Sequence, residues 1–240
     1  MEKSTLGAAL VGGIVGAAVS AGLLLSIGPQ MMGERMVRST LLEQPEILLE
    51  AGDVLRDRQF APILEANREL FETPFASSVQ GASAEDADVV MVEFYDYACG
   101  YCRQAKPDID RLLKEDPKLR VVYREYPVLG PASIVAAQAS LAASEAGKFY
   151  EFHEALYALG APTEESIGAA LESVGLDMEA AISKPEYQAE LQKNYELAGL
   201  VGATGTPVFV IGDRVINSAD GYQAYKDAIE AARAKAERDS

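Results

Sequence analysis

Two cysteines separated by two residues are the part of this sequence most able to do chemistry. Cys99 and Cys102 are the only cysteines among the 240 residues. They follow an apolar run over 89–95 that predicts a buried strand, and they precede residues 103–115, which predict a helix bent at Pro107. Unpaired N–H groups and the dipole at the start of a helix stabilise a negatively charged sulfur. The sequence therefore predicts that Cys99 is a thiolate near neutral pH and that Cys102 closes a disulfide with it.

Other uses of this cysteine pair are less consistent with the sequence. A structural zinc site needs four soft ligands, and the chain offers one histidine, His153, and no third cysteine. A purely structural disulfide over so short a loop would add little stability. A two-coordinate site for Cu(I) would need only the two thiolates. Redox chemistry is favoured by the spacing and by its place between a strand and a helix, with the local disulfide and the Cu(I) site as alternatives.

The composition limits the class of partner. The formal net charge is −16, and 49% of the residues are hydrophobic, which is enough for one ordinary core. Because phosphates would be repelled by this charge, nucleic acid and anionic lipid surfaces are not expected as partners. We expect neither a cofactor nor a bound metal.

The N-terminal segment predicts export from the cytoplasm. Residues 6–27 carry no charge and are long enough to cross a bilayer as a helix. Residues 1–28 are therefore interpreted as an uncleaved signal anchor or as a signal peptide cleaved near residues 19–21. Either interpretation places the dithiol where disulfides persist. We expect a periplasmic protein, anchored in the inner membrane by residues 6–27 or released after cleavage.

A helical arm is predicted over residues 29–72. Leucines recur every seven residues at Leu41, Leu48 and Leu55, with acidic and basic residues on the other face. Residues 59–62 predict a break in this helix. Two interpretations of the apolar stripe stay open, namely that it packs on its own domain or that it joins copies of the chain into a homo-oligomer.

The remaining elements give the fold class. They are a linker (73–88), a strand (118–126), a block of helices (about 131–200), a β-hairpin (207–216) and a closing helix (218–236). Thr163, followed by two glutamates, predicts a capped helix start within the block. This order predicts an α/β protein with a thioredoxin fold over 89–238, carrying an inserted helical domain and preceded by the membrane or signal segment and the arm.

Four segments resemble the DsbA-like family of thioredoxin-fold proteins: residues 92–102, 123–130, 149–157 and 205–210. The resemblance implies a thiol:disulfide oxidoreductase that exchanges disulfides with secreted, cysteine-containing client proteins and has a membrane protein as redox partner. Residues 42–48 of the arm are similar to the arm of suppressor-of-copper-sensitivity C proteins. The archetypal oxidase of the family has Pro-His between its cysteines, whereas this chain has Gly-Tyr. The sequence therefore leaves open an oxidase, an oligomeric isomerase or reductase, and a Cu(I)-handling protein.

In such an enzyme Cys99 is the nucleophile that forms a mixed disulfide with the client, and Cys102 resolves it. The resemblance implies that Pro207 follows a cis peptide bond and exposes the backbone of Thr206, which pairs with an extended client segment. Glu93 lies in an apolar strand at a position whose alternation faces the core, where burial raises the pKa of a carboxyl. The resemblance implies that Glu93 helps to move the proton of Cys102. The alternative interpretation is that Glu93 faces the edge of the sheet and has no such role.

The residues around the dithiol have different expected roles. Gly100 and Tyr101 lie between the cysteines, and we expect them to contact the client. Asp96 and Tyr97 are interpreted as local structure. His153, on an inserted helix, is interpreted as a structural group with a satisfied hydrogen bond.

Overall fold

The structure is a computed structural model that describes residue 33 and residues 36–181 and 184–239. It contains two compact units, one ending at Leu55 and one beginning at Arg56. The predicted anchor over residues 6–27 lies outside the described residues. Among the residues that are described, no helix is both long and apolar enough to cross a membrane.

The predicted break at residues 59–62 is wrong. Helix α2 (Glu46–Ala66) continues through Pro62 for 21 residues, and the break comes at Asn67, before the short helix α3 (Arg68–Glu72). A proline inside a helix costs about 3 kcal/mol because its ring displaces one hydrogen bond. Phe60 and Leu64, one helical turn apart, pack in the core of the second unit, and this burial offsets the cost.

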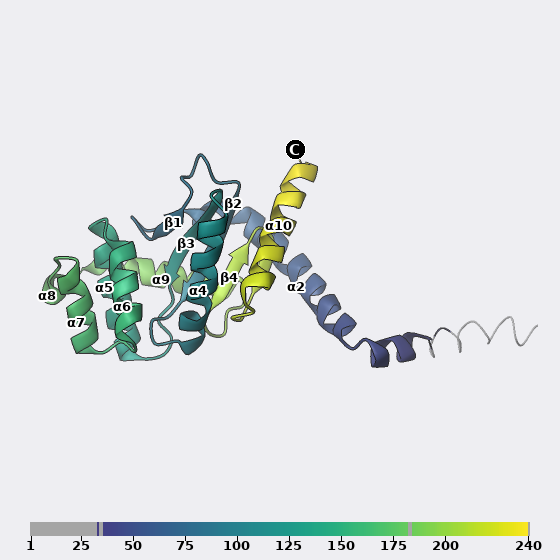
Figure 1. The fold of residues 1–240 in the computed structure, drawn as a ribbon, viewed down its shortest axis with the longest axis horizontal. Coiled ribbons are helices and arrows are strands. Elements are labelled where there is room, and N and C mark those ends of the chain that lie inside the picture. Colours follow the sequence, from purple (N-terminus) through teal and green to yellow (C-terminus); the bar gives the residue numbers. More distant parts are fainter. Residues whose placement is uncertain (1–32, 34–35, 182–183, 240) are drawn as a thin grey trace, which may run out of the picture. The chain divides into compact units, whose positions relative to one another are not determined.

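The second unit is built on a mixed five-stranded sheet in the order β1-β3-β2-β4-β5 (Figure 1). Its strands are β1 (Val79–Gly81), β2 (Val89–Tyr95), β3 (Leu119–Glu125), β4 (Val208–Ile211) and β5 (Arg214–Ile216). Strands β2 and β3 are parallel and are joined by helix α4 (Gly100–Glu115), as a parallel pair requires a crossover. The other pairs are antiparallel, including the predicted hairpin of β4 and β5.

The segment interpreted as a linker, 73–88, contains the edge strand β1. Val79 pairs with Val122 and Gly81 with Arg120. Gly81 has φ +88°, and a Cβ there would lie 2.2 Å from the carbonyl oxygen of Leu119, so only glycine allows the two backbones to approach this closely. Three residues are too few to show the alternation by which strands are recognised.

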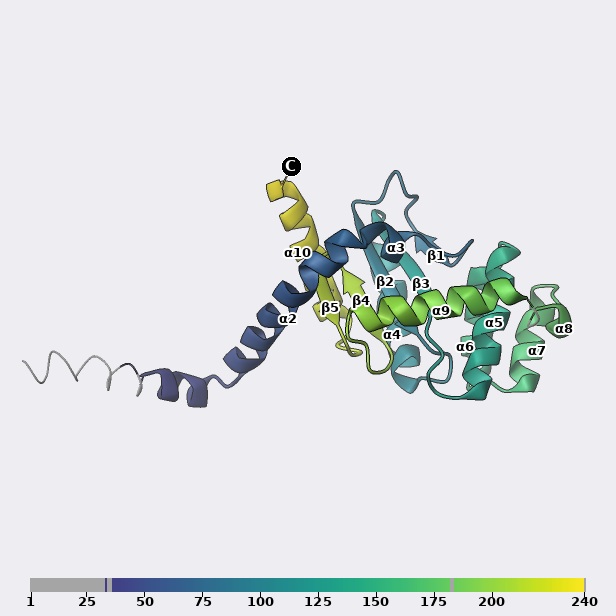
Figure 2. The same cartoon turned by 180° about the vertical axis from the view of Figure 1, so that it is seen from behind.

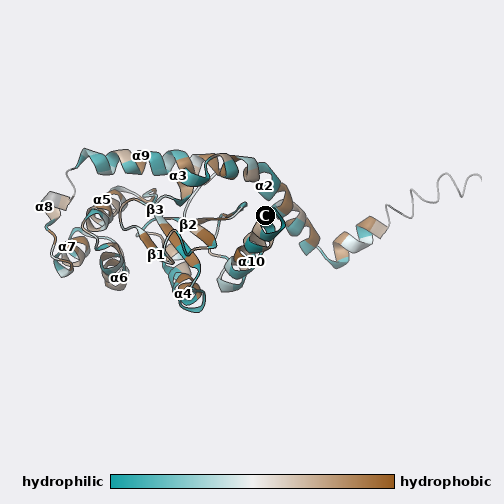
Figure 3. Ribbon diagram, turned by 90° about the horizontal axis from the view of Figure 1, so that it is seen from above, coloured by the Kyte–Doolittle hydropathy of each residue, from teal (hydrophilic) through white to brown (hydrophobic). Residues whose placement is uncertain are grey.

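Helices cover both faces of the sheet, which explains why β2 is apolar on both faces apart from Glu93. Met91 and Tyr95 point into one core, while Val92 and Phe94 point into the other. Figure 3 shows α3 and α9 over one face and α4 and α10 over the other.

The block of helices lies between β3 and β4, where the sequence predicts it. Its members are α5 (Pro131–Glu145), α6 (Phe149–Leu159), α7 (Glu164–Ser173), α8 (Met178–Ala181) and α9 (Pro185–Leu200), and α10 (Tyr222–Asp239) follows β5. Thr163 caps α7 in a reciprocal pair of hydrogen bonds with Ser166, as its position predicts. Helix α9 returns from the other inserted helices across the sheet (Figure 2).

Candidate active site

The dithiol lies at the end of β2, in the first turn of α4. Cys99 is the N-cap residue and Cys102 lies within the helix, which begins at Gly100, three residues earlier than predicted. The Cys99 N–H donates to the carbonyl of Asp96 at 2.9 Å, and the Cys99 carbonyl accepts from Arg103 N–H at 3.2 Å. The two cysteines are not joined in a disulfide; Cys99 is 5% exposed and Cys102 is fully buried.

The two thiols have pKa values shifted in opposite directions. The pKa of Cys99 is lowered to about 5, chiefly by a hydrogen bond from the Cys102 side chain; burial opposes the shift, while hydrogen bonding by Thr206 and the N–H groups of Cys102 and Tyr101 add to it. The pKa of Cys102 is raised far above its usual range by burial, by the hydrogen bond to Cys99 and by the charge of Glu93. At neutral pH Cys99 is therefore a thiolate that accepts a hydrogen bond from the Cys102 thiol.

Thr206 and Pro207 lie beside the dithiol because of the strand register. Phe94 of β2 pairs with Val208 of β4, so the residues just before β4 lie next to those just after β2. The Thr206–Pro207 peptide bond is cis. The carbonyl oxygen of Thr206 lies 3.2 Å from the sulfur of Cys99.

Glu93 lies in the core, as the alternation predicts, and not at the sheet edge. It is 3% exposed and shares a face of β2 with Met91 and Tyr95. Burial raises the pKa of Glu93 to about 8, partly opposed by the positive charge of Lys106. A carboxyl with this pKa gains and loses its proton near neutral pH.

The two residues between the cysteines face outward. Tyr101 is 67% exposed, and Gly100 is exposed with open space where a Cβ would lie. The contribution of Tyr101 to the sulfur comes from its backbone N–H, which lowers the pKa of Cys99.

His153 and Tyr97 belong to a buried hydrogen-bonded cluster. The Tyr97 hydroxyl lies 3.0 Å from His153 Nδ1 and 3.1 Å from Ser140 Oγ. Burial lowers the pKa of His153, so the ring is neutral. This satisfied, uncharged histidine is consistent with the structural role predicted for it.

Sequence reasoning missed Arg103, the residue that follows the dithiol. Its guanidinium donates to the carbonyls of Tyr157 at 2.6 Å and Gly160 at 2.8 Å, at the end of α6. A cation at a helix C-terminus satisfies carbonyls that lack a partner within the helix. Arg103 therefore joins the inserted helices to the active-site helix, across 54 residues of sequence, which no local pattern could predict.

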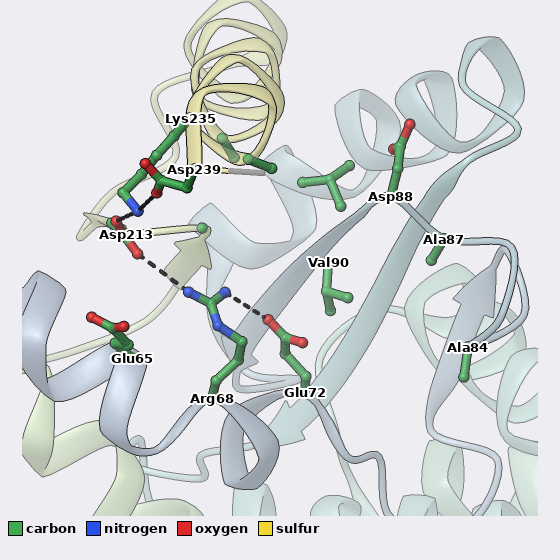
Figure 4. Close-up of a pocket in the computed structure, with 14 residues that line it drawn as sticks. Glu65, Arg68, Glu72, Ala84, Ala87, Asp88, Val90, Asp213, Lys235 and Asp239 are labelled. Carbon is green, nitrogen blue, oxygen red and sulfur yellow. Dashed lines mark hydrogen bonds and ion pairs between the residues drawn. The ribbon is translucent and has the colours of Figure 1, made fainter.

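A cavity of about 450 Å³ lies at the start of β2, the strand end opposite the dithiol (Figure 4). Several of its charged side chains pair with one another, as Arg68 does with Glu72 at 3.2 Å and Lys235 with Asp213 at 3.3 Å. Within the described ranges, no group of three or more His, Cys, Asp or Glu residues is arranged to hold a metal ion.

Known proteins resemble this chain in both sequence and fold. The sequence model of the DSBA-like thioredoxin domain matches residues 90–230. A thioredoxin-like oxidoreductase from Silicibacter pomeroyi is 38% identical, with a TM-score of 0.65 over 70% of this chain and 98% of that one. The catalytic domain of Proteus mirabilis ScsC is 28% identical, with a TM-score of 0.65 over 73% of this chain and 99% of that one.

Two further relatives are matched over very different shares of their own length. A periplasmic thioredoxin-like protein from Salmonella enterica serovar Typhimurium is 26% identical, with a TM-score of 0.62 over 70% of this chain and 95% of that one. Among curated sequences, the Na(+)/H(+) antiporter NhaA 1 of Salinispora arenicola is 29% identical over 153 residues, which are 61% of this chain. The chain spans only about a quarter of the length of that antiporter (24%).

Proposed function

This chain belongs to the family of DSBA-like thioredoxin domains, whose members are thiol:disulfide oxidoreductases, and from that premise we propose that it exchanges disulfides with cysteine-containing client proteins through Cys99 and Cys102. The observation that carries the proposal is the opposite shift of the two thiol pKa values. One sulfur is ready to attack at neutral pH, while the other keeps its proton until the first exchange has occurred.

The proposed disulfide exchange has two steps. The Cys99 thiolate attacks a client disulfide, forming a bond to one client sulfur and releasing the other as a thiolate. Cys102 then gives its proton to Glu93 and attacks Cys99, which closes the Cys99–Cys102 disulfide and releases the second client sulfur. Two electrons pass from the dithiol to the client, and the same steps in reverse oxidise a client dithiol.

Glu93 is proposed as the group that takes and returns the proton of Cys102. When it is ionised, Glu93 raises the pKa of Cys102, so the two groups are close enough to interact. Because the pKa of Glu93 is about 8, the carboxyl can hold the proton while Cys102 attacks and can return it in the reverse direction.

The direction favoured by the site is client oxidation. A stabilised Cys99 thiolate makes the reduced dithiol the more stable state, so its disulfide is readily transferred to a client. The isomerase alternative is supported by the arm, whose residues before Arg56 expose large apolar side chains. These are Met36, Val37, Leu42, Leu48, Leu49, Val54 and Leu55. We propose that this stripe joins copies of the chain, which would bring several dithiols to one client.

We propose a periplasmic location with a membrane redox partner. The proposal is supported by the apolar, uncharged sequence of residues 6–27 and by the periplasmic relative from Salmonella. A dithiol that must be reoxidised after each client also requires a partner that accepts its two electrons.

A trap tests the proposed function. In Cys102→Ala, Cys99 can form a mixed disulfide with a client, but no second sulfur resolves it. Incubation with an unfolded protein in which one cysteine is held as an activated mixed disulfide should give a covalent complex that dithiothreitol releases. Cys99→Ala is the matched control and should give none. Absence of the complex in Cys102→Ala would refute the proposal.

A further inference from the structure

Arg103 connects two helix ends that meet beside the dithiol. It follows Cys102 directly in α4, and its half-buried guanidinium reaches the end of α6. Nη1 donates to the carbonyl of Tyr157 at 2.6 Å, and Nη2 donates to the carbonyl of Gly160 at 2.8 Å. The last carbonyls of a helix have no donor farther along it, and a cation there also stabilises the negative end of the helix dipole.

The same residue also bonds the chain just before and at the nucleophile. Nη2 of Arg103 donates to the carbonyl of Tyr97 at 3.3 Å, and the Arg103 N–H donates to the carbonyl of Cys99 at 3.2 Å. The guanidinium also lies 5.2 Å from the centre of the Tyr157 ring, where a cation is attracted to the aromatic face. One residue therefore ties both ends of the turn from Tyr97 to Cys102 to α6.

Tyr97 provides a second attachment of this turn to α6. The residue is 1% exposed, and its hydroxyl lies 3.0 Å from His153 Nδ1. Its ring packs against the ring of Tyr157, with the two ring centres 5.2 Å apart. Supporting contacts of this kind keep the groups that act directly on a reacting atom in a fixed direction.

The direction of the donors in the turn decides how well it stabilises a charged sulfur. The Cys102 thiol and the backbone N–H groups of Cys102 and Tyr101 all contribute to the low pKa of Cys99. A hydrogen bond to a charged atom is strong, and it weakens steeply when its angle is poor. A turn that was free to tilt away from α6 would therefore weaken all of these bonds at once.

We propose that Arg103 is a positioning residue, which holds the turn from Tyr97 to Cys102 against the end of α6 and so directs its hydrogen-bond donors at the sulfur of Cys99. Through this residue the inserted helix α6 contributes to the reactivity of the dithiol. The inference deepens the proposed function and rests on it, because that function requires a stable Cys99 thiolate.

Alkylation of the reduced full chain by iodoacetamide tests the inference. Only the thiolate reacts, so rates between about pH 3 and pH 9 give the midpoint at which Cys99 ionises. Cys102 stays protonated in this range, because burial raises its pKa far above the usual value.

Two variants separate the position of the turn from the charge of Arg103. Arg103→Gln removes the guanidinium, whereas Arg103→Lys keeps a positive charge but lacks the planar fork that reaches three carbonyls. Arg111→Gln is the matched control. It removes another arginine of α4, whose guanidinium lies 3.8 Å from the centre of the Tyr222 ring.

Both Arg103 variants should raise the midpoint by about one pH unit, because losing one hydrogen bond to a charged sulfur changes its ionisation about ten-fold. From a midpoint of about 5, this change leaves roughly five-fold less thiolate at pH 5, measured from rates relative to those at about pH 9. Arg111→Gln should keep the midpoint of the unmodified protein.

Three outcomes would overturn these assignments. A midpoint that Arg103→Lys restores to the unmodified value would assign the effect to charge alone and overturn the inference. An unchanged midpoint in both variants, with a lower free energy of unfolding in urea, would show that Arg103 only ties α4 to α6 and would also overturn it. If Arg103→Gln does not fold, Arg103→Lys alone decides. Absence of the mixed disulfide in Cys102→Ala would overturn the proposed function, which the midpoints do not measure.

Discussion

The sulfur of Cys99 lies 3.2 Å from the carbonyl oxygen of Thr206, a residue 107 positions later in the chain. This contact follows from the antiparallel pairing of β2 with β4, which brings the start of β4 to the end of β2. Because that carbonyl belongs to the residue before Pro207, a client bonded to Cys99 in the proposed reaction would lie next to half-buried Thr206. The nucleophile and the residue expected to pair with an extended client segment are therefore neighbours in the fold.

Replacing Cys102 should raise the pKa of Cys99. The hydrogen bond from Cys102 is the largest cause of the low value of about 5. Cys102→Ala removes it, and the remaining donors cannot fully compensate. The absorbance of the thiolate, followed from acid to neutral pH, should show the midpoint moving upward. Tyr101→Phe keeps the backbone N–H and serves as control; an unchanged midpoint in Cys102→Ala would contradict the assignment.

Glu93 should make the reduced protein less stable as the pH rises. Its pKa is 4.5 in an unfolded chain and about 8 in the fold, so between these values the unfolded state binds fewer protons than the native state. The free energy of unfolding should then fall by about 1.4 kcal/mol per pH unit across this window. Glu93→Gln should remove that part of the decline in urea titrations at several pH values. A parallel decline in both proteins would argue against the raised pKa.

The Cys99 thiolate should make the reduced protein more stable than the oxidised one at neutral pH. The pKa of Cys99 falls from 9.0 to about 5, so its stabilising effect is complete above pH 9 and is lost as the pH falls through 5. The difference between the denaturation midpoints of the reduced and oxidised forms should therefore shrink as the medium is acidified. A difference that stays constant with pH would show that ionisation of Cys99 does not stabilise the reduced form.

Much of the fold follows from sequence patterns that are local. The apolar run before Cys99 predicts β2, and the alternation within it predicts that Glu93 faces the core, as the structure finds. Long-range partners give no such signal. Asp96 binds backbone 32 and 33 positions away, and nothing near it in sequence indicates this. Short elements also escape, since β1 has three residues and depends on a close approach that only Gly81 permits.

Arg124 should be the most costly single charge to remove. It is 1% exposed on β3, and it pairs with Glu190 at 2.8 Å and hydrogen bonds to Asn194. Its other nitrogen, Nη2, donates to the carbonyls of Leu70, Phe71 and Thr73, so that it joins α9 to the end of α3. Burial lowers the pKa of Arg124, while Glu190 opposes that shift.

Arg124→Met should lower the free energy of unfolding by about 3–5 kcal/mol, because it leaves Glu190 and several carbonyls without a donor in a buried place. Arg124→Lys should restore only part of this loss, since an ammonium cannot reach both sets of acceptors as the planar guanidinium does. The control is Arg68→Met, which breaks ion pairs whose side chains are 19–45% exposed and should cost less than about 1 kcal/mol. Urea unfolding of the three variants measures the differences, and equal losses in Arg124→Met and Arg68→Met would show that the buried arginine does not hold α3 and α9 together.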